Sequence, residues 1–358
     1  MPNAVRATRA PENPILTPAM VSPSRPDLEV VGVFNPAAIR HDGEVILLLR
    51  VAEAARGVAD GEVAAPVYDS ASGRLEIRRW RRDTPSLDVS DPRLIVVDGR
   101  TWLTSISHLR IARSTDGVRF TIEPAPALCS ATADEAFGVE DPRITRIDGT
   151  CWINYTAVSS RGIATALAST KDFTTFERHG VIFPPDNRDV TIFPETIGGR
   201  FVALHRPMPS GIGEPAIWCA TSPDLITWGE HRFVAGGRPN GWEDVKIGGG
   251  AVPFRVRAGG RDAWLAVYHG ASGSPPAYSL GALLLDGEQP WRVIGRSRGP
   301  ILTPETPYER SGFFGGVVFT CGLLAEADAV RIYYGAADGV TAVAELSLDD
   351  ILASLDAP

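Results

Sequence analysis

The sequence has few of the features that mark metal-binding, nucleic-acid-binding or ATP-binding proteins. Its cysteines are widely spaced, with no C-x-x-C pair and no histidine at metal-ligand spacing, so we expect buried thiols and no bound metal or cofactor. The formal net charge is −8 and no long basic run offsets it, which argues against a nucleic-acid partner. No G-x-x-x-x-G-K-[ST] motif occurs, so a P-loop is excluded. The cysteines are Cys129, Cys151, Cys219 and Cys321.

Long apolar runs are also missing. No segment approaches about 18 consecutive apolar residues, and the early arginines Arg6 and Arg9 are followed by no apolar stretch. We therefore expect a soluble cytoplasmic protein that makes no membrane contact. Helical periodicity is scarce as well, because it is strong only in "SLDDILASLDAP", residues 347–358. We expect Ser347 to cap a short C-terminal helix there.

What the chain does contain is a repeated unit, in which a proline-bearing or glycine-rich opener precedes a short alternating strand. The spacing is roughly 50–65 residues, which is typical of β-propeller blades rather than of helix pairs. No linker interrupts the pattern, so we expect an all-β propeller that forms one domain over residues 1–358. The six openers are Asn35-Pro36, Asp91-Pro92, Asp141-Pro142, Phe193-Pro194, the segment from Gly248, and "FGGVVFT" at 314–320.

Two further repeats support this organisation. The phrases "ARSTDGVRF", "ASTKDFTTF" and "TSPDLITW" each indicate a strand end and a tight turn, and we expect Asp116, Asp172 and Asp224 to stabilise those turns. The phrases "NPILTP" at 13–18 and "GPILTP" at 299–304 predict that the two chain ends occupy equivalent places and close a ring.

Of the two Asp-Pro-Arg cassettes, only the second has an additional acid. Glu140 precedes Asp141, whereas a serine precedes Asp91. Either aspartate can be a turn residue or the ion-pair partner of the arginine two positions later. Because inner strands of a propeller begin at its axial pocket and crowded carboxylates raise a pKa, the sequence favours a catalytic site at Asp141.

Cations near other openers indicate an anion pocket. Arg188 and Arg206 flank one expected strand and Lys246 begins the next, and guanidinium groups bind oxyanions in bidentate fashion. Asp189 would repel such an anion. His269 is expected either to contact the anion or to be a buried core residue. Four tryptophans offer sugar-stacking faces, although aromatic residues on strands are more often core residues: Trp102, Trp152, Trp242 and Trp264.

Eight collinear motifs carry a resemblance to a known family: "NPILTP", "GVEDPRIT", "NRDVTIFPE", "HRP", "SPDLITWG", "KIGGGAVP", "VYHG" and "IYYGAAD". Together they span nearly the whole chain, which resembles glycoside hydrolase family 130, the β-mannoside phosphorylases and β-mannosidases. The resemblance implies a five-bladed propeller. The six openers fit five blades if the last unit shares a blade with the N-terminal segment.

The resemblance also implies roles for individual residues. Asp141 corresponds to the general acid, which relays its proton through a mannose hydroxyl to the glycosidic oxygen. We expect Asp91 at the cavity edge, as a blade-repeat residue on the substrate side. The phosphate-binding positions correspond to Arg188, Arg206 and Lys246, with Tyr268 and His269 nearby. The mannose-binding positions correspond to Asn35, Arg50 and Asp338.

Two reactions and one non-enzymatic role remain open at this point. Inverting phosphorolysis needs cations that hold phosphate and no base, and Arg188, Arg206 and Lys246 favour it. Hydrolysis of β-1,2-mannosides needs a second carboxylate as base, for which Glu214 and Glu243 are the candidates. A glycan-binding propeller without catalysis would need no convergent acid.

Substrate range and assembly are less defined. We expect a β-manno-oligosaccharide and inorganic phosphate as substrates, with the linkage, β-1,2 or β-1,4, left open. A homo-oligomer is possible from the sequence. Residues 52–66 are expected to be a flexible insertion rather than a loop that closes a neighbour's site.

Overall fold

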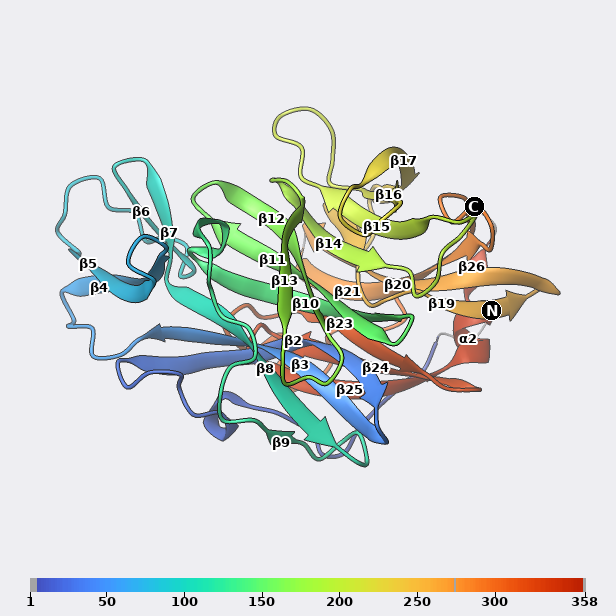
Figure 1. Ribbon diagram of the computed structural model, residues 1–358, viewed down its shortest axis with the longest axis horizontal. Coiled ribbons are helices and arrows are strands. Elements are labelled where there is room, and N and C mark those ends of the chain that lie inside the picture. The colour runs from blue at the N-terminus through green and yellow to red at the C-terminus, as the bar shows by residue number, and fades with distance from the viewer. Residues whose placement is uncertain (1–4, 274, 357–358) are drawn as a thin grey trace.

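The computed structural model describes residues 5–273 and 275–356, so the ends of the expected 1–358 domain lie outside the described residues (Figure 1). The described chain is almost entirely strand. Its helical elements are short: η1 (Pro18–Met20), η2 (Ala133–Glu135), α1 (Pro307–Arg310) and α2 (Leu348–Ala353). The backbone N of Asp350 donates to Ser347 Oγ at 3.2 Å, which confirms the expected cap of the C-terminal helix. Within these residues no helix has the length and apolar character needed to cross a membrane.

The strands form four larger sheets and two separate hairpins. One sheet has the order β13 (Glu177–Phe183), β12 (Gly162–Thr170), β11 (Thr150–Ser159), β10 (Gly138–Ile147), β8 (Ser105–Ser114), β3 (Glu44–Ala55), β2 (Leu28–His41), with β9 (Thr121–Ile122) beside β8. The second has the order β14 (Asn187–Ile192), β15 (Phe201–Pro207), β16 (Ile217–Ser222), β17 (Gly229–Ala235).

The third sheet has the order β18 (Lys246–Gly249), β20 (Arg261–Gly273), β21 (Pro276–Asp286), β22 (Val293–Ser297), β26 (Leu355–Asp356), with β19 (Phe254–Ala258) beside β20. The fourth has the order β1 (Ala7–Arg9), β25 (Val340–Ser347), β24 (Ala329–Ala336), β23 (Val318–Ala325). The hairpins are β4 (Glu62–Asp69) with β5 (Arg74–Arg81), and β6 (Leu94–Val97) with β7 (Arg100–Leu103).

Buried apolar clusters fill the spaces between successive groups of strands. They lie between β2–β3–β8 and β10–β12, between β10–β13 and β14–β16, between β15–β17 and β20–β21, between β20–β21 and β23–β25, and between β23–β25 and β2–β3. This order returns to its starting group. We call β2, β10, β14, β18 and β23 the inner strands, because each contributes to the central cavity described below.

The two ends of the chain meet in the fourth sheet. β1 pairs with β25 in antiparallel register, so the N-terminal strand completes the sheet of the last strands. Leu16 bridges to Thr341 of β25, and Leu302 bridges to Leu280 of β21. Each "ILTP" segment therefore bridges to a corresponding strand of its sheet, β25 or β21, and each precedes an inner strand, β2 or β23. Their equivalence is confirmed.

Three inner strands share the same irregularity. Asn35, Asp141 and Asp189 adopt left-handed φ angles of 48°, 47° and 57°. At each of them the pairing with the next strand shifts register, which is the mark of a β-bulge. A bulge redirects the side chain of its extra residue, so the Asn-Pro and Asp-Pro openers turn polar groups toward the centre.

The turn aspartates are structural, as expected. Asp116 Oδ1 accepts hydrogen bonds from the backbone N of Val118 and of Arg119, both at 2.8 Å. Asp172 and Asp224 accept the equivalent bonds from the residues two and three positions later. These turns close the hairpins away from the central cavity.

Two expectations about the region between β3 and β8 are wrong. The Asp91 copy is no blade, because it precedes the separate hairpin β6–β7, which Figure 1 shows at the edge of the molecule beside β4–β5. Residues 52–66 are not a loop, since residues 52–55 end β3 and 62–66 begin β4. The two hairpins pack through Val63, Ala65 and Ile95 against Phe137 and Val158.

A largely buried ion pair connects the N-terminal strand β1 to α1. Arg9 Nε donates to Glu309 Oε1 at 2.8 Å, and the Glu309 side chain is fully buried. Arg9→Met should lower the free energy of unfolding by about 2–4 kcal/mol, because it leaves a buried carboxylate without its cation. Urea denaturation measures this. Arg6→Met, at an exposed position of the same segment, should cost less than about 0.5 kcal/mol. Equal losses in the two variants would contradict the prediction.

Candidate active site

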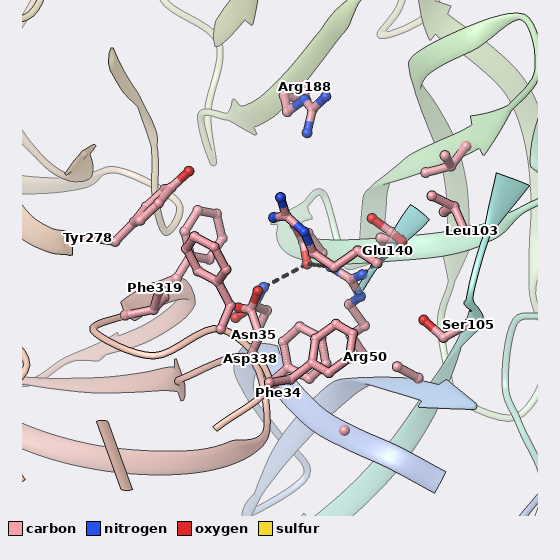
Figure 2. Close-up of a pocket in the computed structure, with 18 of the residues that line it drawn as sticks. Phe34, Asn35, Arg50, Leu103, Ser105, Glu140, Arg188, Tyr278, Phe319 and Asp338 are labelled. Atoms are coloured by element: carbon pink, nitrogen blue, oxygen red, sulfur yellow. Dashed lines mark hydrogen bonds and ion pairs between the residues drawn. The ribbon is translucent and has the colours of Figure 1, made fainter. Parts of the chain in front are cut away.

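A cavity of about 290 Å³ lies where the inner strands meet. Each inner strand contributes to its lining: Asn35, Asp141, Asp189, Lys246 and Phe319. Figure 2 shows Arg188 on one side of this cavity and Phe34, Asn35 and Asp338 on the other. The convergence of opener residues that the repeats predicted is therefore present, and the cavity is small for a ligand pocket.

An acidic cluster surrounds the guanidinium of Arg50. Arg50 Nη1 donates to Asp141 Oδ1 at 3.1 Å and Nη2 donates to Glu140 Oε1 at 2.8 Å. Asn35 Nδ2 also donates to Asp141 Oδ1, at 2.9 Å. The guanidinium lies 4.6 Å from the ring centroid of Phe34, which holds it in place. Both donors reach the same oxygen of Asp141, so the other oxygen is left for a substrate.

This cluster favours a bound proton. Burial raises the pKa of Glu140, and the nearby Asp141 adds to the effect, although Arg50 opposes it. Burial likewise raises the pKa of Asp338 to about 6, with Asp141 raising it further and Arg50 and Arg93 lowering it. Ionising all three carboxyl groups is unfavourable, because one guanidinium charge offsets only part of their mutual repulsion. Protonation of Glu140 and Asp338 is therefore favoured at a higher pH in this site than in water.

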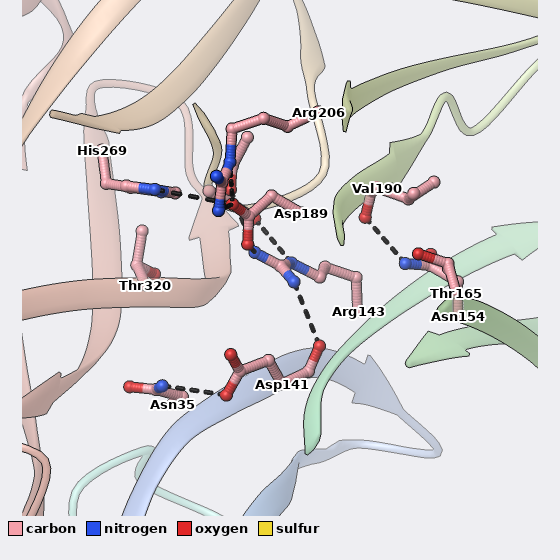
Figure 3. Close-up of polar contacts among 12 residues, drawn as sticks. Asn35, Asp141, Arg143, Asn154, Thr165, Asp189, Val190, Arg206, His269 and Thr320 are labelled. Carbon is pink, nitrogen blue, oxygen red and sulfur yellow. Dashed lines mark hydrogen bonds and ion pairs between the residues drawn. The ribbon is translucent and has the colours of Figure 1, made fainter. Parts of the chain in front are cut away.

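Arg143 lies behind this cluster and is 1% exposed. Its guanidinium donates to the backbone oxygens of Gly250 at 3.0 Å and Gly249 at 2.9 Å. It also donates to the backbone oxygen of Asp141 at 3.1 Å (Figure 3). The ion pair between Arg143 and the Asp141 side chain, which was one alternative from the sequence, is thus not formed. Arg143 binds the backbone of Asp141 instead, which leaves the carboxyl group to the cavity.

Arg188, Arg206 and Lys246 line the cavity together, as the sequence predicted for an anion pocket. Within the described part of the chain, neither Arg188 nor Lys246 forms an ion pair with a carboxylate. Arg206 Nε donates to Asp189 Oδ2 at 2.6 Å. The positive charge of Arg188 and Lys246 is therefore available to a ligand.

The negative charge of Asp189 is balanced by neighbouring groups, so it does not act on an anion unopposed. Its carboxylate pairs with Arg206, lies 3.5 Å from Arg143 Nη2, and lies 3.5 Å from His269 Nε2 (Figure 3). Burial would raise the pKa of Asp189, but the positive charges of Arg206, Arg143 and Arg188 hold it below its usual range. The expectation that Asp189 opposes anion binding is weakened, because three cationic or polar groups surround it.

His269 is 1% exposed and lines the cavity. Burial lowers its pKa to about 3, so the imidazole is neutral near pH 7. Neither ring nitrogen has a hydrogen-bond partner among the described residues. The ring can therefore exchange a hydrogen bond with a ligand but contributes no charge.

Four predicted residues lie outside the cavity lining. Tyr268 faces the opposite side of β20 and donates its hydroxyl to Glu243 Oε2 at 2.6 Å. Glu243 is fully buried, also paired with Arg296 at 2.9 Å and with Arg238, so it has no access to a substrate. Glu214 lies on an exposed segment. Asp91 binds Arg93, and the arginine, not the aspartate, lines the cavity.

Several lining residues were missed by the sequence reasoning. The aromatic wall consists of phenylalanines and a tyrosine, and the four proposed tryptophans lie outside the lining. The "FFGG" segment at the sixth opener was the available signal for part of it. Across residues 5–273 and 275–356, no group of three histidine, cysteine or acidic side chains has the arrangement of a metal site. The missed lining residues with rings or charge are Phe34, Arg93, Tyr278, Phe313, Phe314 and Phe319.

The raised pKa of Asp338 predicts a pH-dependent stability. Its folded-state pKa of about 6 exceeds the model-peptide value of 3.8, so the free energy of unfolding should fall as pH rises from about 4 to about 6. Asp338→Asn, which tolerates the φ of 50° at this position, should remove this fall. The Tm of the variant relative to wild type should therefore be higher at pH 7 than at pH 4, as measured by differential scanning calorimetry.

Asp91→Asn is the control, because its stability relative to wild type should change with pH in the opposite direction. The hydrogen bond from Arg93 lowers the pKa of Asp91 to about 2, so this variant should be less stable than wild type at pH 7. The difference should narrow as pH falls below about 4 toward 2. A Tm difference for Asp338→Asn that is the same at pH 4 and pH 7 would refute the assigned pKa.

Comparison with known proteins identifies the family. A family model described as β-1,4-mannooligosaccharide phosphorylase, of glycoside hydrolase family 130, matches residues 84–357. A β-1,2-mannobiose phosphorylase of Listeria innocua is 44% identical over 352 residues, which is 97% of this chain and 98% of that protein. A 1,2-β-oligomannan phosphorylase of Thermoanaerobacter sp. is 39% identical over 249 residues, 69% of this chain and 80% of its own length.

Similarity extends to a solved structure. The β-1,2-mannobiose phosphorylase from Listeria innocua in complex with β-1,2-mannobiose superposes with a TM-score of 0.92 at 44% identity. The match covers 97% of this chain and 98% of that one. The chain belongs to glycoside hydrolase family 130.

Proposed function

We propose that the protein cleaves β-1,2-mannosides by inverting phosphorolysis and releases α-mannose 1-phosphate. The observation that carries this proposal is the cationic wall of the cavity. Arg188 and Lys246 lack a carboxylate partner in the described chain, whereas Glu214 and Glu243, the base candidates for hydrolysis, are both outside the lining. A nucleophile held by cations needs no base, because phosphate is already an anion.

The relatives support the reaction and favour the linkage. The two relatives described above are named for phosphorylases that act on β-1,2-mannobiose and 1,2-β-oligomannan. The family model is named for a β-1,4 enzyme, but the 44% identical relative covers nearly the whole chain. We therefore assign β-1,2-linked mannosides as substrates, with inorganic phosphate as co-substrate.

Asp141 is the proposed general acid. Its Oδ1 accepts hydrogen bonds from Asn35 and Arg50, which leaves Oδ2 as the atom that donates the proton. The family resemblance implies that this proton passes through a mannose hydroxyl. The bond from C1 to the glycosidic oxygen breaks as a phosphate oxygen bonds to C1 from the opposite face, and the proton ends on the departing sugar.

The other site residues receive roles on either side of the transferred sugar. Asn35, Arg50 and Asp338 hold the mannosyl unit, because they line the cavity together with Asp141, and Asn35 and Arg50 bind Asp141 directly. Arg188, Arg206 and Lys246 hold phosphate, with His269 as a neutral hydrogen-bonding group. Tyr268 supports this wall from the core rather than by contact.

The proposal also includes the number of blades, the domain organisation and the location of the protein. The five strand groups and the five apolar clusters between them support a five-bladed propeller, closed by pairing of β1 with β25. The β4–β5 and β6–β7 hairpins are insertions in the first blade. We treat the chain as one domain, and a cytoplasmic location stays a prediction of its composition.

Product analysis tests the reaction. With β-1,2-mannobiose, mannose 1-phosphate and mannose should form in equal amounts when phosphate is present, and turnover should stop without it. Arg188→Met should raise the KM for phosphate about tenfold or more, because a charge-assisted contact is lost. Arg232→Met, on β17 of the same sheet but outside the cavity, is the control. Mannose release at a rate independent of phosphate would establish hydrolysis instead.

Asp141→Asn tests the acid. The amide keeps the size and hydrogen bonding of the side chain but has no acidic proton, so kcat should fall by about 10²–10⁴-fold. Calorimetric binding of β-1,2-mannobiose should stay within severalfold of wild type. Asp148→Asn, at the exposed turn of the same β10–β11 hairpin, should leave kcat unchanged. Wild-type turnover by the Asp141 variant would remove this residue from the mechanism.

A further inference from the structure

The two Asp-Pro-Arg copies present opposite members of the motif to the cavity. In the second copy Asp141 lines the cavity, and Arg143 is buried against backbone oxygens. In the first copy Arg93 lines the cavity, and Asp91 lies behind it. The first copy thus adds an oriented guanidinium to the same site from outside the ring of inner strands.

Three contacts hold Arg93 in one orientation. Its Nε donates to Asp91 Oδ1 at 3.0 Å and its Nη2 donates to Asp91 Oδ2 at 2.7 Å. The guanidinium carbon lies 4.8 Å from the ring centroid of Phe314, on the facing segment that precedes β23. Among the described residues, Nη1 makes no hydrogen bond, so one edge of a fixed guanidinium is available to a ligand.

Burial gives the depth of each group in the cavity. Asn35 is 4% exposed and His269 is 1% exposed, so the groups proposed to hold mannose and phosphate lie at the floor. The Arg93 side chain is 46% exposed and Phe313 is 42% exposed, so these groups lie at the mouth. With the transferred mannosyl unit at the floor, the departing sugar extends toward Arg93, Phe313 and Phe314.

We propose that Arg93, clamped by Asp91 and stacked on Phe314, binds the departing sugar in phosphorolysis and the acceptor sugar in the reverse reaction. This assignment rests on the proposed function. Arg93 is the group that contacts sugar hydroxyls, through Nη1, and Phe314 supplies an apolar face beside it. Asp91 is a positioning residue, because it acts through the guanidinium.

Steady-state kinetics of phosphorolysis and of the reverse reaction distinguishes a contact with the sugar from a general loss of activity. Arg93→Met keeps the apolar stem and removes the guanidinium. It should raise the KM for β-1,2-mannobiose, and for mannose as acceptor, about tenfold, which is the loss expected for one charge-assisted hydrogen bond. The KM values for phosphate and for mannose 1-phosphate should change less than twofold, since the phosphate wall is intact.

Two further variants test the clamp. Asp91→Asn retains the guanidinium but weakens its orientation, so it should raise the same two sugar KM values by a smaller factor, about threefold. Phe314→Leu removes the ring while the Asp91 pair remains, and it should raise them as well. Thermal denaturation shows that each variant is folded.

Arg81→Met is the matched control. Arg81 makes the same pair with Asp83, with Nε to Oδ1 at 2.9 Å and Nη2 to Oδ2 at 2.8 Å, on an exposed edge away from the cavity. Its kinetics should equal wild type. Unchanged sugar KM values in Arg93→Met, or an equal rise in the KM for phosphate, would overturn the assignment. A wild-type enzyme that forms no mannose 1-phosphate would instead refute phosphorolysis, and the KM for mannobiose cleavage would still test Arg93.

Discussion

The geometry of the cavity depends on the buried guanidinium of Arg143. A buried cation is tolerated only when its donors are satisfied, and Arg143 uses backbone oxygens of β10 and of the β18 end, with Asp189 of β14 nearby. These bonds connect the strand that carries the proposed acid to the strands that carry the cations. The distance between the acid and the anion site is therefore set by a group that contacts no substrate.

The glycine run at 248–250, beside Arg143, is needed for the close packing of the strands that Arg143 connects. A Cβ at Gly249 would lie 2.5 Å from the backbone oxygen of Asp189, and one at Gly250 would lie 2.6 Å from that of Val267. A side chain at Gly248 would lie 2.5 Å from the Asp189 carboxylate. Without side chains at these positions, β18 can lie close to β14 at Gly248 and Gly249, and the chain can lie close to β20 at Gly250. The run serves strand packing rather than the backbone approach of a ligand.

Charge is divided between two sides of the cavity, and this division suits the proposed chemistry. Arg50 pairs with Glu140 and Asp141, and burial raises the pKa of Glu140 and of the nearby Asp338, so that side favours a bound proton. On the other side Asp189 is neutralised by its partners, and Arg188 and Lys246 keep their charge. A group that must donate a proton and a group that must stay anionic are thereby held in opposite electrostatic environments.

Local patterns in the sequence were sufficient for much of the fold. Strand alternation, the Ser347 cap and the turn aspartate Asp116 involve residues a few positions apart, so their contacts follow from spacing alone. The openers Asn35-Pro36 and Asp141-Pro142 marked two of the three bulges, whereas the bulge at Asp189 lies before its predicted opener and Asp91-Pro92 forms none. Polar residues at or near these openers did meet in one cavity. Alternation could also have separated Tyr268 from His269, since adjacent residues of a strand face opposite sides.

The tertiary structure decided what spacing could not. Glu243 is excluded as a base, because it is buried and paired with Tyr268 of β20 and Arg296 of β22. These partners come from two different strands, so the spacing in the sequence did not reveal them. Asp91 and Asp141 sit in the same three-residue motif, yet only Asp141 reaches the cavity with its carboxyl group. The sequence determined that each motif would form a turn or bulge with a nearby arginine. Which member faces the substrate depends on the surface against which each segment packs, an inner strand for one and a separate hairpin for the other.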